Sequence, residues 1–230
     1  MADGMARWIR LQDLLSTDLG GGPRPWKLAW IINAQKGGTL PFVLALMAHY
    51  GVTSATAFTY AALHGSYGVA WIIKDHVFPD PGWQRTATVP SGLLAFFAVL
   101  GPYWLAPWLL ISRDVQQPPW LLAAATFTYA LGLTLMIGSD AQKHYTLACR
   151  RGLITTGFFA AVRHPNYLGE MLIYGSFAAL AGHWIPWAVL AWVWGGVFSA
   201  NIARKEHSMA RYPEWPAYVA RTGRLLPRLW

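Results

Sequence analysis

The sequence predicts an all-α protein, a polytopic bundle of about six to seven transmembrane helices. The first observation is the composition: the 230 residues are 55% hydrophobic and only 12% charged, whereas a soluble domain carries about 25% charged residues. The second is the length of the apolar runs, which are near or above the roughly 20 residues that cross a bilayer as a helix. The third is that the few charges are crowded between those runs.

Six apolar segments are predicted to span the membrane within a single domain, residues 1–230. An amphipathic arm, residues 1–25, precedes them and ends in a run of glycine and proline that breaks helices. Residues 26–138 contain four spans, and residues 139–230 contain two spans, a polar connection and a basic tail. The predicted spans cover residues 28–50, 53–73, 91–111, 119–137, 167–183 and 185–202.

The basic residues predict on which side of the membrane each connection lies. With six spans, every Lys and Arg except Lys36 and Arg113 falls on the side of the two termini. Because Lys and Arg favour the cytoplasmic side, both termini are predicted to be cytoplasmic, in a bacterial inner membrane or the endoplasmic reticulum. The net charge of +8 is therefore first a topology signal. The same basic face would also attract either phosphate groups or anionic lipid headgroups.

A compact polar cluster stands directly before the fifth apolar segment. Pro165 is well placed at the first turn of a helix, and this helix would carry Asn166 and Glu170 on one face. Such polar groups are rarely buried without partners. The cluster therefore either holds a polar ligand or anchors the helix at the lipid headgroups. Its members are Arg163, His164, Asn166, Tyr167 and Glu170.

Three polar residues lie inside the first two predicted spans. Gln35 and Lys36 fall in the first span and Tyr67 in the second, all at a depth of roughly 10 Å at ~1.5 Å per residue. Burying an ionisable group in a span is costly and indicates a functional site, although Lys36 could instead extend to the interface. A phenol supported by an amide or an ammonium can donate a proton to a carbonyl oxygen. These three residues are therefore the candidate catalytic residues.

Further polar residues follow the fourth and sixth spans. Asp140 comes directly after the fourth span, where an acid opposes the helix dipole. Two explanations are open: Asp140 accepts a hydrogen bond from a ligand, or it pairs with Arg150 or Arg151. The tail begins with Lys205, Glu206 and His207. Because a two-span hairpin joins the 139–165 connection to the tail, both are predicted to lie close together on the cytoplasmic side.

Several classes of site are excluded by the residues themselves. The single cysteine, Cys149, excludes an intramolecular disulfide and a thiolate metal cluster. The histidines do not have the spacing of a metal site, and no phosphate-binding glycine loop is present. The N-terminus lacks the pattern of a cleaved signal peptide. The predicted partners are membrane lipids and a lipophilic small molecule, with no metal, no nucleic acid and no obligatory protein partner.

These motifs resemble those of the steroid 5-alpha-reductase family and the wider group of sterol reductases. The resemblance covers about residues 134–230, and residues 30–67 match more loosely. It implies an integral-membrane reductase that binds NADPH in a cytoplasm-facing cavity and passes hydride to the beta carbon of an enone. The matching elements are Ser139-Asp140, Arg151-Gly152-Leu153, Asn166-Tyr167-Leu168-Gly169-Glu170, Lys205-Glu206-His207, the Tyr- and Pro-rich tail, and Gln35 with Tyr67.

The resemblance also implies roles for individual residues. Tyr67 resembles the catalytic tyrosine and Gln35 its glutamine neighbour, whereas Lys36 stands where the family has glutamate. An ammonium can donate a hydrogen bond or a proton to a carbonyl oxygen but cannot accept one. The residues that would contact NADPH are Asp140, Asn166 and Glu170, together with the weaker candidates Arg151, Arg163, His164, Tyr167, Lys205, Glu206 and His207.

The sequence thus predicts an NADPH-dependent reductase that acts on a conjugated carbonyl or double bond of a lipophilic substrate, with Lys36 and Tyr67 at the oxygen. Two alternatives remain open. Isoprenylcysteine carboxyl methyltransferases share an Arg-His-Pro-x-Tyr element and bind S-adenosylmethionine in a similar cavity. A non-catalytic lipid-binding protein of the same fold would also tolerate Lys36. The combination of Asp140, Asn166 and Glu170 favours the reductase.

Overall fold

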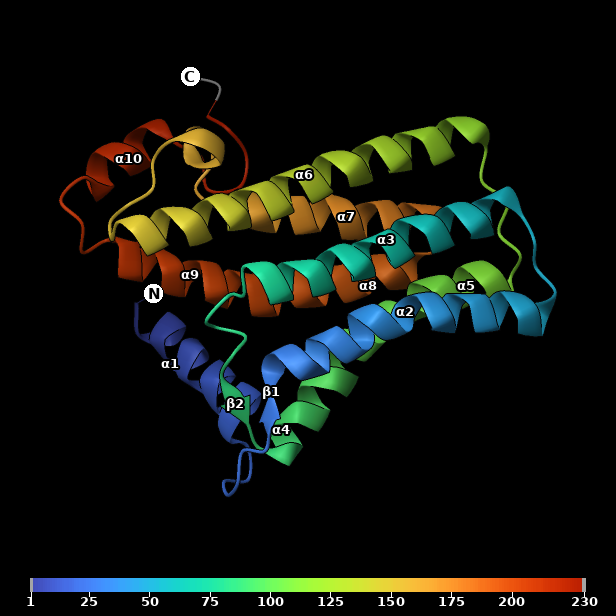
Figure 1. Cartoon of the computed structure of the whole chain (residues 1–230), viewed down its shortest axis with the longest axis horizontal. Coiled ribbons are helices and arrows are strands. Elements are labelled where there is room, and N and C mark those ends of the chain that lie inside the picture. Colours follow the sequence, from blue (N-terminus) through green and yellow to red (C-terminus); the bar gives the residue numbers. More distant parts are fainter. Residues whose placement is uncertain (1, 229–230) are drawn as a thin grey trace.

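The computed structural model describes residues 2–228 as a bundle of long, roughly aligned helices (Figure 1). Strands β1 (Trp26–Lys27) and β2 (Thr86–Ala87) form a short antiparallel pair at one end, with Trp26 opposite Ala87. The helices are α1 (Ala2–Asp13), α2 (Leu28–Tyr50), α3 (Ala55–Val77), α4 (Val89–Leu94), α5 (Leu105–Ser112), α6 (Pro119–Cys149), α7 (Pro165–Ala181), α8 (Trp184–Val193), α9 (Ser199–Met209) and α10 (Trp215–Arg221).

Short stretches of other helical geometry extend several of these helices. A π-helical turn, Leu14–Asp18, follows α1, and a second, Trp194–Phe198, joins α8 to α9 without a break. The stretch between α4 and α5 is π-helical over Ala95–Leu100 and 3-10 helical over Gly101–Trp104. A separate 3-10 turn, Gly157–Phe159, precedes α7.

Three of these continuous helical stretches are long and apolar enough to cross a membrane. They are Val89–Ser112, Pro119–Cys149 and Trp184–Met209, with 24, 31 and 26 residues. The other three helices that were predicted as spans, α2, α3 and α7, contribute seven of the fifteen buried polar residues of the described part of the chain, among them Lys36, His64 and Lys74. The composition and these three stretches are those of a membrane protein.

Each predicted span coincides with a helix or a continuous helical stretch, but the ends of the fourth and sixth were predicted too early. The sixth was predicted to end at residue 202, whereas its helical stretch continues to Met209. The first segment matches α2 at both ends, because Gly51 adopts a left-handed conformation (φ 68°) that ends the helix. The fourth segment was predicted to end at residue 137, whereas α6 continues to Cys149. Its added turns are fixed by polar contacts: Asp140 pairs with Lys74, and the side chain of Gln142 binds the backbone of the segment before α7.

Glycines allow the helices that carry the site to approach closely. Helices α6 and α7 lie side by side (Figure 1), and a Cβ atom added to Gly169 would lie 2.5 Å from the carbonyl oxygen of Gly132. In α3, a Cβ added to Gly68 would lie 2.4 Å from the carbonyl oxygen of Lys36 in α2. Small residues permit such backbone contacts between helices in membranes. The position of Lys36 is therefore fixed against α3 by the backbone itself.

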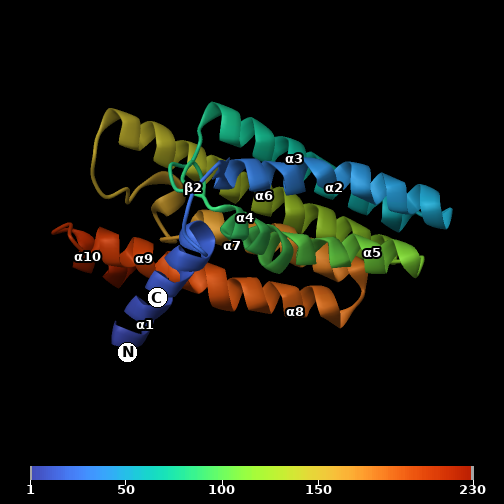
Figure 2. The same ribbon diagram turned by 90° about the horizontal axis from the view of Figure 1, so that it is seen from below.

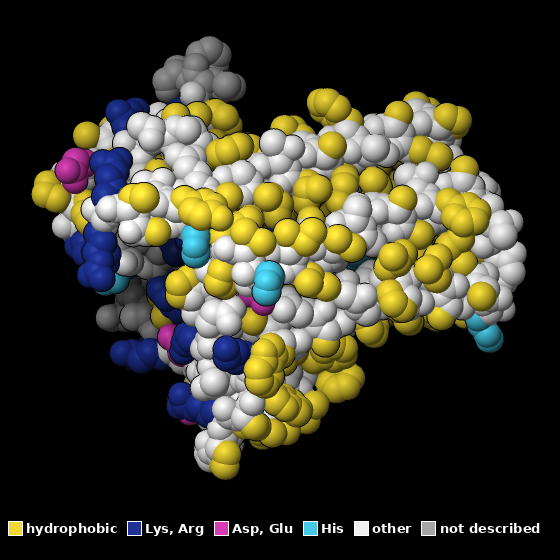
Figure 3. Space-filling model, viewed as in Figure 1, with side chains coloured by type: hydrophobic (Ala, Val, Ile, Leu, Met, Phe, Trp, Pro, Cys, Tyr) yellow, Lys and Arg dark blue, Asp and Glu magenta, His cyan; other side chains and the backbone are white. Residues whose placement is uncertain are grey.

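The amphipathic arm was predicted to precede the spans, and α1 lies across the end of the bundle beside α9 (Figure 2). The indole of Trp8 donates a hydrogen bond to the carbonyl of Gly196 over 3.2 Å, and the guanidinium of Arg204 lies 3.3 Å from a carboxylate oxygen of Asp13. On the visible face, Lys and Arg side chains gather at this end and hydrophobic side chains cover the remainder (Figure 3). The fold thus separates a basic end from an apolar body.

Candidate functional site

The ammonium group of Lys36 is enclosed by aromatic rings in the interior of the bundle. Lys36 is only 4% exposed, and its Nζ lies 4.6 Å from the ring centroids of both Tyr67 and Tyr174, 5.2 Å from that of Trp71 and 5.6 Å from that of Tyr103. Aromatic faces attract a cation at such distances. We call these four rings the lysine cage. They come from α3, α7 and the 3-10 turn before α5.

Hydroxyl groups complete the polar environment of Lys36. Its ammonium donates a hydrogen bond to the hydroxyl of Tyr174, whose ring is stacked on that of Tyr103 at 4.1 Å. The hydroxyl of Tyr67 is fully buried and has no hydrogen-bond partner within residues 2–228. The expected proximity of Lys36 and Tyr67 is therefore present, and one tyrosine hydroxyl beside the lysine is left to donate to another group.

Gln35 and His64 lie near the lysine cage but are engaged differently. The amide of Gln35 is fully buried and contacts the hydroxyl of Thr39 at 3.5 Å, one turn along its own helix. The ring of His64 is stacked on Phe177 at 4.1 Å, and its Nδ1 lies 3.0 Å from the hydroxyl of Tyr60. Neither side chain contacts the lysine ammonium in the way expected of a catalytic neighbour, and the catalytic role of Gln35 remains a prediction.

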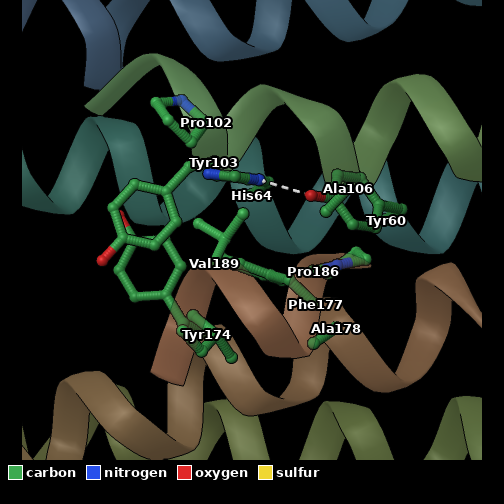
Figure 4. Close-up of a pocket in the computed structure, with 11 residues that line it drawn as sticks. Tyr60, His64, Pro102, Tyr103, Ala106, Tyr174, Phe177, Ala178, Pro186 and Val189 are labelled. Atoms are coloured by element: carbon green, nitrogen blue, oxygen red, sulfur yellow. Dashed lines mark hydrogen bonds between the residues drawn. The ribbon is translucent and has the colours of Figure 1, made fainter. Parts of the chain in front are cut away.

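A small cavity adjoins the lysine cage (Figure 4). Tyr103 and Tyr174 of the cage form one wall, and His64 with its hydrogen bond to Tyr60 forms another. The space measures about 10 Å³, which is on the scale of one water molecule. Apart from these polar groups the lining is apolar: Pro102, Ala106, Phe177, Ala178, Pro186, Val189 and Leu190. The chemistry of these walls suits an apolar molecule with one polar group at the cage.

A buried ion pair lies beside the lysine cage, toward the basic end. Lys74 Nζ and Asp140 Oδ2 are 2.7 Å apart, and these residues are only 4% and 7% exposed. The same ammonium lies 4.3 Å from the ring of Trp71, so this indole contacts the cations of both Lys74 and Lys36. The sequence left open an ion pair with Arg150 or Arg151, but the structure pairs Asp140 with Lys74. Its role as a cofactor contact remains a prediction.

A second ion pair, less buried, lies closer to the solvent. The ammonium of Lys143 in α6 is 2.8 Å from a carboxylate oxygen of Asp80 in the connection after α3. Burial by itself would raise the pKa of Asp80, but the neighbouring Lys143 ammonium outweighs it and holds that pKa well below its usual range. This pair joins the end of α3 to the last turns of α6.

The start of the predicted cofactor segment is joined to the tail by a network that we call the tail clamp. Glu206 accepts hydrogen bonds from Arg163 Nε at 2.9 Å and from Arg224 Nη2 at 2.6 Å. The backbone continues the contact, because the amide of Arg163 donates to Gly223 and that of His164 to Arg224. Burial lowers the pKa of His164, although Glu206, whose Oε1 lies 3.4 Å from His164 Nε2, partly offsets this.

The tail clamp divides the predicted cofactor residues into two groups. Arg163, His164 and Glu206 are occupied by contacts within the clamp, and Asp140, outside it, is occupied by Lys74. The others remain available. Among the residues that the structure describes, the side chains of Asn166, Tyr167, Glu170 and Lys205 form no hydrogen bond or salt bridge, and Lys205 Nζ instead lies 4.6 Å from the ring of Tyr167. Arg151 and His207 are exposed at the same end.

Four residues of the site were not predicted, although the spacing of three of them offers a signal. Tyr174 follows Glu170 by four residues, and Trp71 and Lys74 follow Tyr67 by four and seven. Each set therefore shares a helix face with a residue that was predicted. Tyr103 has no such signal. Within residues 2–228 no group of three or more His, Cys, Asp or Glu side chains could hold a metal ion.

Comparison with known proteins identifies the family. A family described as a protein of unknown function (DUF1295) matches residues 94–222. The chain belongs to this family. The match contains Tyr103, Tyr174 and the predicted cofactor segment, whereas Lys36 and Tyr67 lie before it.

Two proteins of Schizosaccharomyces pombe (strain 972 / ATCC 24843) are similar over part of the chain. The uncharacterized protein C594.04c is 37% identical over 93 residues, which are 38% of this chain and 27% of that protein. The uncharacterized protein C7D4.09c is 32% identical over 63 residues, which are 25% of this chain and 23% of that protein. The chain thus matches about a quarter of the length of these relatives.

Proposed function

We propose that the protein is an integral-membrane, NADPH-dependent reductase that acts on a conjugated carbonyl or double bond of a lipophilic substrate. In this proposal the bundle crosses the membrane six times, both termini are cytoplasmic, and the cofactor enters from the basic end. The family includes steroid 5-alpha-reductase-like proteins, in agreement with the motifs of residues 134–230. Lys36 and Tyr67 are placed at the oxygen of the substrate.

The observation that carries the proposal is that α7 connects the cofactor residues to the lysine cage. Asn166, Glu170 and Tyr174 follow one another at intervals of four residues and so share one face of the helix. Tyr174 accepts the hydrogen bond of Lys36. At ~1.5 Å per residue, the distance along the helix from Asn166 to Tyr174 is roughly 12 Å. A molecule held at the start of α7 would therefore extend toward Lys36.

The available side chains at the basic end fit a dinucleotide phosphate. Lys205, Arg151 and His207 can bind phosphate oxygens without losing an internal ion pair. The amide of Asn166 and the carboxylate of Glu170 can hydrogen-bond ribose hydroxyls or a carboxamide. When bound, NADPH supplies a hydride. Arg163 is less suited to bind a phosphate, because its guanidinium is already hydrogen-bonded to Glu206 and Thr222.

The residues of the lysine cage would act on the substrate oxygen. Tyr67 has a hydroxyl without a partner, and the ammonium of Lys36 is held beside it by Tyr174. Both can donate a hydrogen bond to a carbonyl oxygen and stabilise the negative charge that develops on it as the beta carbon accepts hydride. Because the surroundings are apolar and nearly dry, such interactions are stronger than in water. The small cavity must widen to admit a substrate.

The proposal is tested by ligand stabilisation of the purified protein in detergent. A ligand that binds only the folded state raises its melting temperature, so NADPH and S-adenosylmethionine are compared in parallel. We expect a rise with NADPH that is reduced in Asn166→Ala and Glu170→Ala and retained in Glu214→Ala, an exposed acid of the tail. A rise with S-adenosylmethionine alone would identify a methyltransferase. No rise with either would favour a non-catalytic lipid-binding protein.

A further inference from the structure

Lys36 differs from the other buried lysine of the structure in having no carboxylate partner. Lys74 is paired with Asp140 at 2.7 Å, whereas Lys36 forms no salt bridge within the described residues. Its ammonium contacts the Tyr174 hydroxyl and the rings of the lysine cage, and the Glu170 carboxylate, one turn earlier in α7, attracts it from beyond salt-bridge distance. A lysine that is desolvated in this way is the kind that acts as a nucleophile toward carbonyl carbons. The separation of the two lysines by a single indole, that of Trp71, makes the contrast direct.

The surroundings of Lys36 provide for an apolar reactant and for a positively charged intermediate. The rings of Tyr103 and Tyr174 form the wall of the adjoining cavity toward Lys36, and apart from Tyr60 and His64 its other walls are apolar, so a lipophilic molecule would place its apolar part in this space and its carbonyl group beside Lys36. In Figure 4 the stacked rings of Tyr103 and Tyr174 form one side of this space. The four rings, at 4.6 to 5.6 Å from Nζ, would stabilise a cation at that atom.

We propose that Lys36 forms a protonated imine with the carbonyl carbon of a lipophilic aldehyde or ketone. The neutral amine attacks the carbonyl carbon, a C–N bond forms, and the oxygen takes up a proton to give a carbinolamine. A second proton on that oxygen lets it leave as water while nitrogen and carbon form a double bond. With the proton that nitrogen loses, the overall change is amine plus carbonyl plus one proton to iminium plus water. The hydroxyl of Tyr174 is hydrogen-bonded to Nζ, and the ring of Tyr67 lies 4.6 Å from it, so the hydroxyls of both tyrosines can pass these protons.

This inference rests on the proposed function for the identity of the substrate and gives that function a distinct mechanism. An iminium withdraws electrons from a conjugated double bond more strongly than a hydrogen-bonded carbonyl does. Hydride from the reduced nicotinamide would add to the beta carbon and leave an enamine, which takes a proton at the alpha carbon, and water then releases the saturated carbonyl. Lysine is the residue that can do this, and glutamate at position 36 could not.

The experiment traps the imine without NADPH. Purified protein in detergent is mixed with a long-chain 2-enal and then with sodium cyanoborohydride, which reduces an iminium to a stable secondary amine. Mass spectrometry of peptides locates the adduct. We expect saturable labelling of Lys36 at least tenfold above that of the partly exposed lysines, Lys27, Lys143 and Lys205. Lys74 serves as the internal control, because it is as buried as Lys36 but paired. Lys36→Arg should lose the adduct.

The possible outcomes separate the covalent role of Lys36 from the proposed reductase function. Labelling of Lys36 no greater than that of the three partly exposed lysines, or equal labelling of Lys74, would overturn the covalent role. Turnover retained in Lys36→Arg would also overturn it while leaving the reductase proposal intact. A specific adduct on Lys36 combined with no melting shift by NADPH would support the covalent site and refute the reductase. Should Lys36→Arg fail to fold, the comparison of Lys36 with Lys74 in the unaltered protein decides.

Discussion

Replacing Asp140 with asparagine is expected to destabilise the protein strongly, because it leaves the ammonium of Lys74 buried without a counter-ion. The two charged atoms are 2.7 Å apart, and the side chains are 5% and 8% exposed. Removing one partner of such a pair costs about 3–5 kcal/mol. The ring of Trp71, 4.3 Å from the ammonium, would offset part of this, since a cation and an aromatic ring attract by ~0.5–2 kcal/mol. We therefore expect a loss of about 3 kcal/mol.

The assay is thermal unfolding of ligand-free protein in detergent. For a chain of this size a loss of 3 kcal/mol corresponds to a fall in melting temperature of roughly 6–12 °C. Asp80→Asn is the matched control: its partner Lys143 lies at a similar 2.8 Å but the pair is 21–28% exposed, so we expect about 0–1 kcal/mol. The double variant Lys74→Met with Asp140→Leu should recover most of the loss. If Asp140→Asn unfolds within about 1 °C of the original protein, the pair is not desolvated and this reasoning is wrong.

Three further predictions concern the site and the helices around it. Tyr67→Phe should retain the NADPH-dependent melting shift and lose turnover of an enone at least a hundredfold, whereas the exposed Tyr50→Phe should retain both the melting shift and turnover; normal turnover in Tyr67→Phe would refute its role. Gly68→Ala should cost about 1–3 kcal/mol in an unfolding assay because the new methyl would lie 2.4 Å from a backbone oxygen, and Gly195→Ala, with open space around it, should be nearly neutral. Because the pKa of His164 is lowered in the folded state, folding favours its neutral form, and stability is lost as the pH falls below the unfolded pKa of ~6.5. Between pH 7.5 and 5.5 the melting temperature of His164→Asn should therefore depend less on pH than that of the original protein. An unchanged dependence would contradict the assignment.

The helical bundle was predictable because apolar runs of sufficient length leave few alternatives. The end of α6 was not predictable, because the apolar run ends near residue 137 while the helix continues to Cys149. What holds those added turns is a set of contacts with distant residues, among them Lys74 with Asp140. Partners separated by so much sequence do not leave a local pattern.

The site was predictable in part for the same reason. Lys36 and Tyr67 could be placed at one depth because helix rise is constant, and the structure brings them together. Tyr103 was not predicted, because its position near Lys36 depends on the 3-10 turn before α5, which leaves no regular spacing in the sequence. Arg163 and Glu206 were both predicted to face a cofactor, yet they bind each other. Two charges predicted for the same ligand can satisfy one another once the tail folds back.

Helix α7 imposes a constraint on how the protein can vary. Its backbone contact with α6 at Gly169 and Gly132 lies between Asn166 and Tyr174, so the helix can neither slide nor rotate there. One residue added after Glu170 would turn Tyr174 by ~100° and carry it away from Lys36. Substitutions can thus alter either end of α7 independently, but its length between those ends cannot change. Under the proposed function, the length of α7 between Asn166 and Tyr174 would set the distance between the bound cofactor and the substrate oxygen at Lys36.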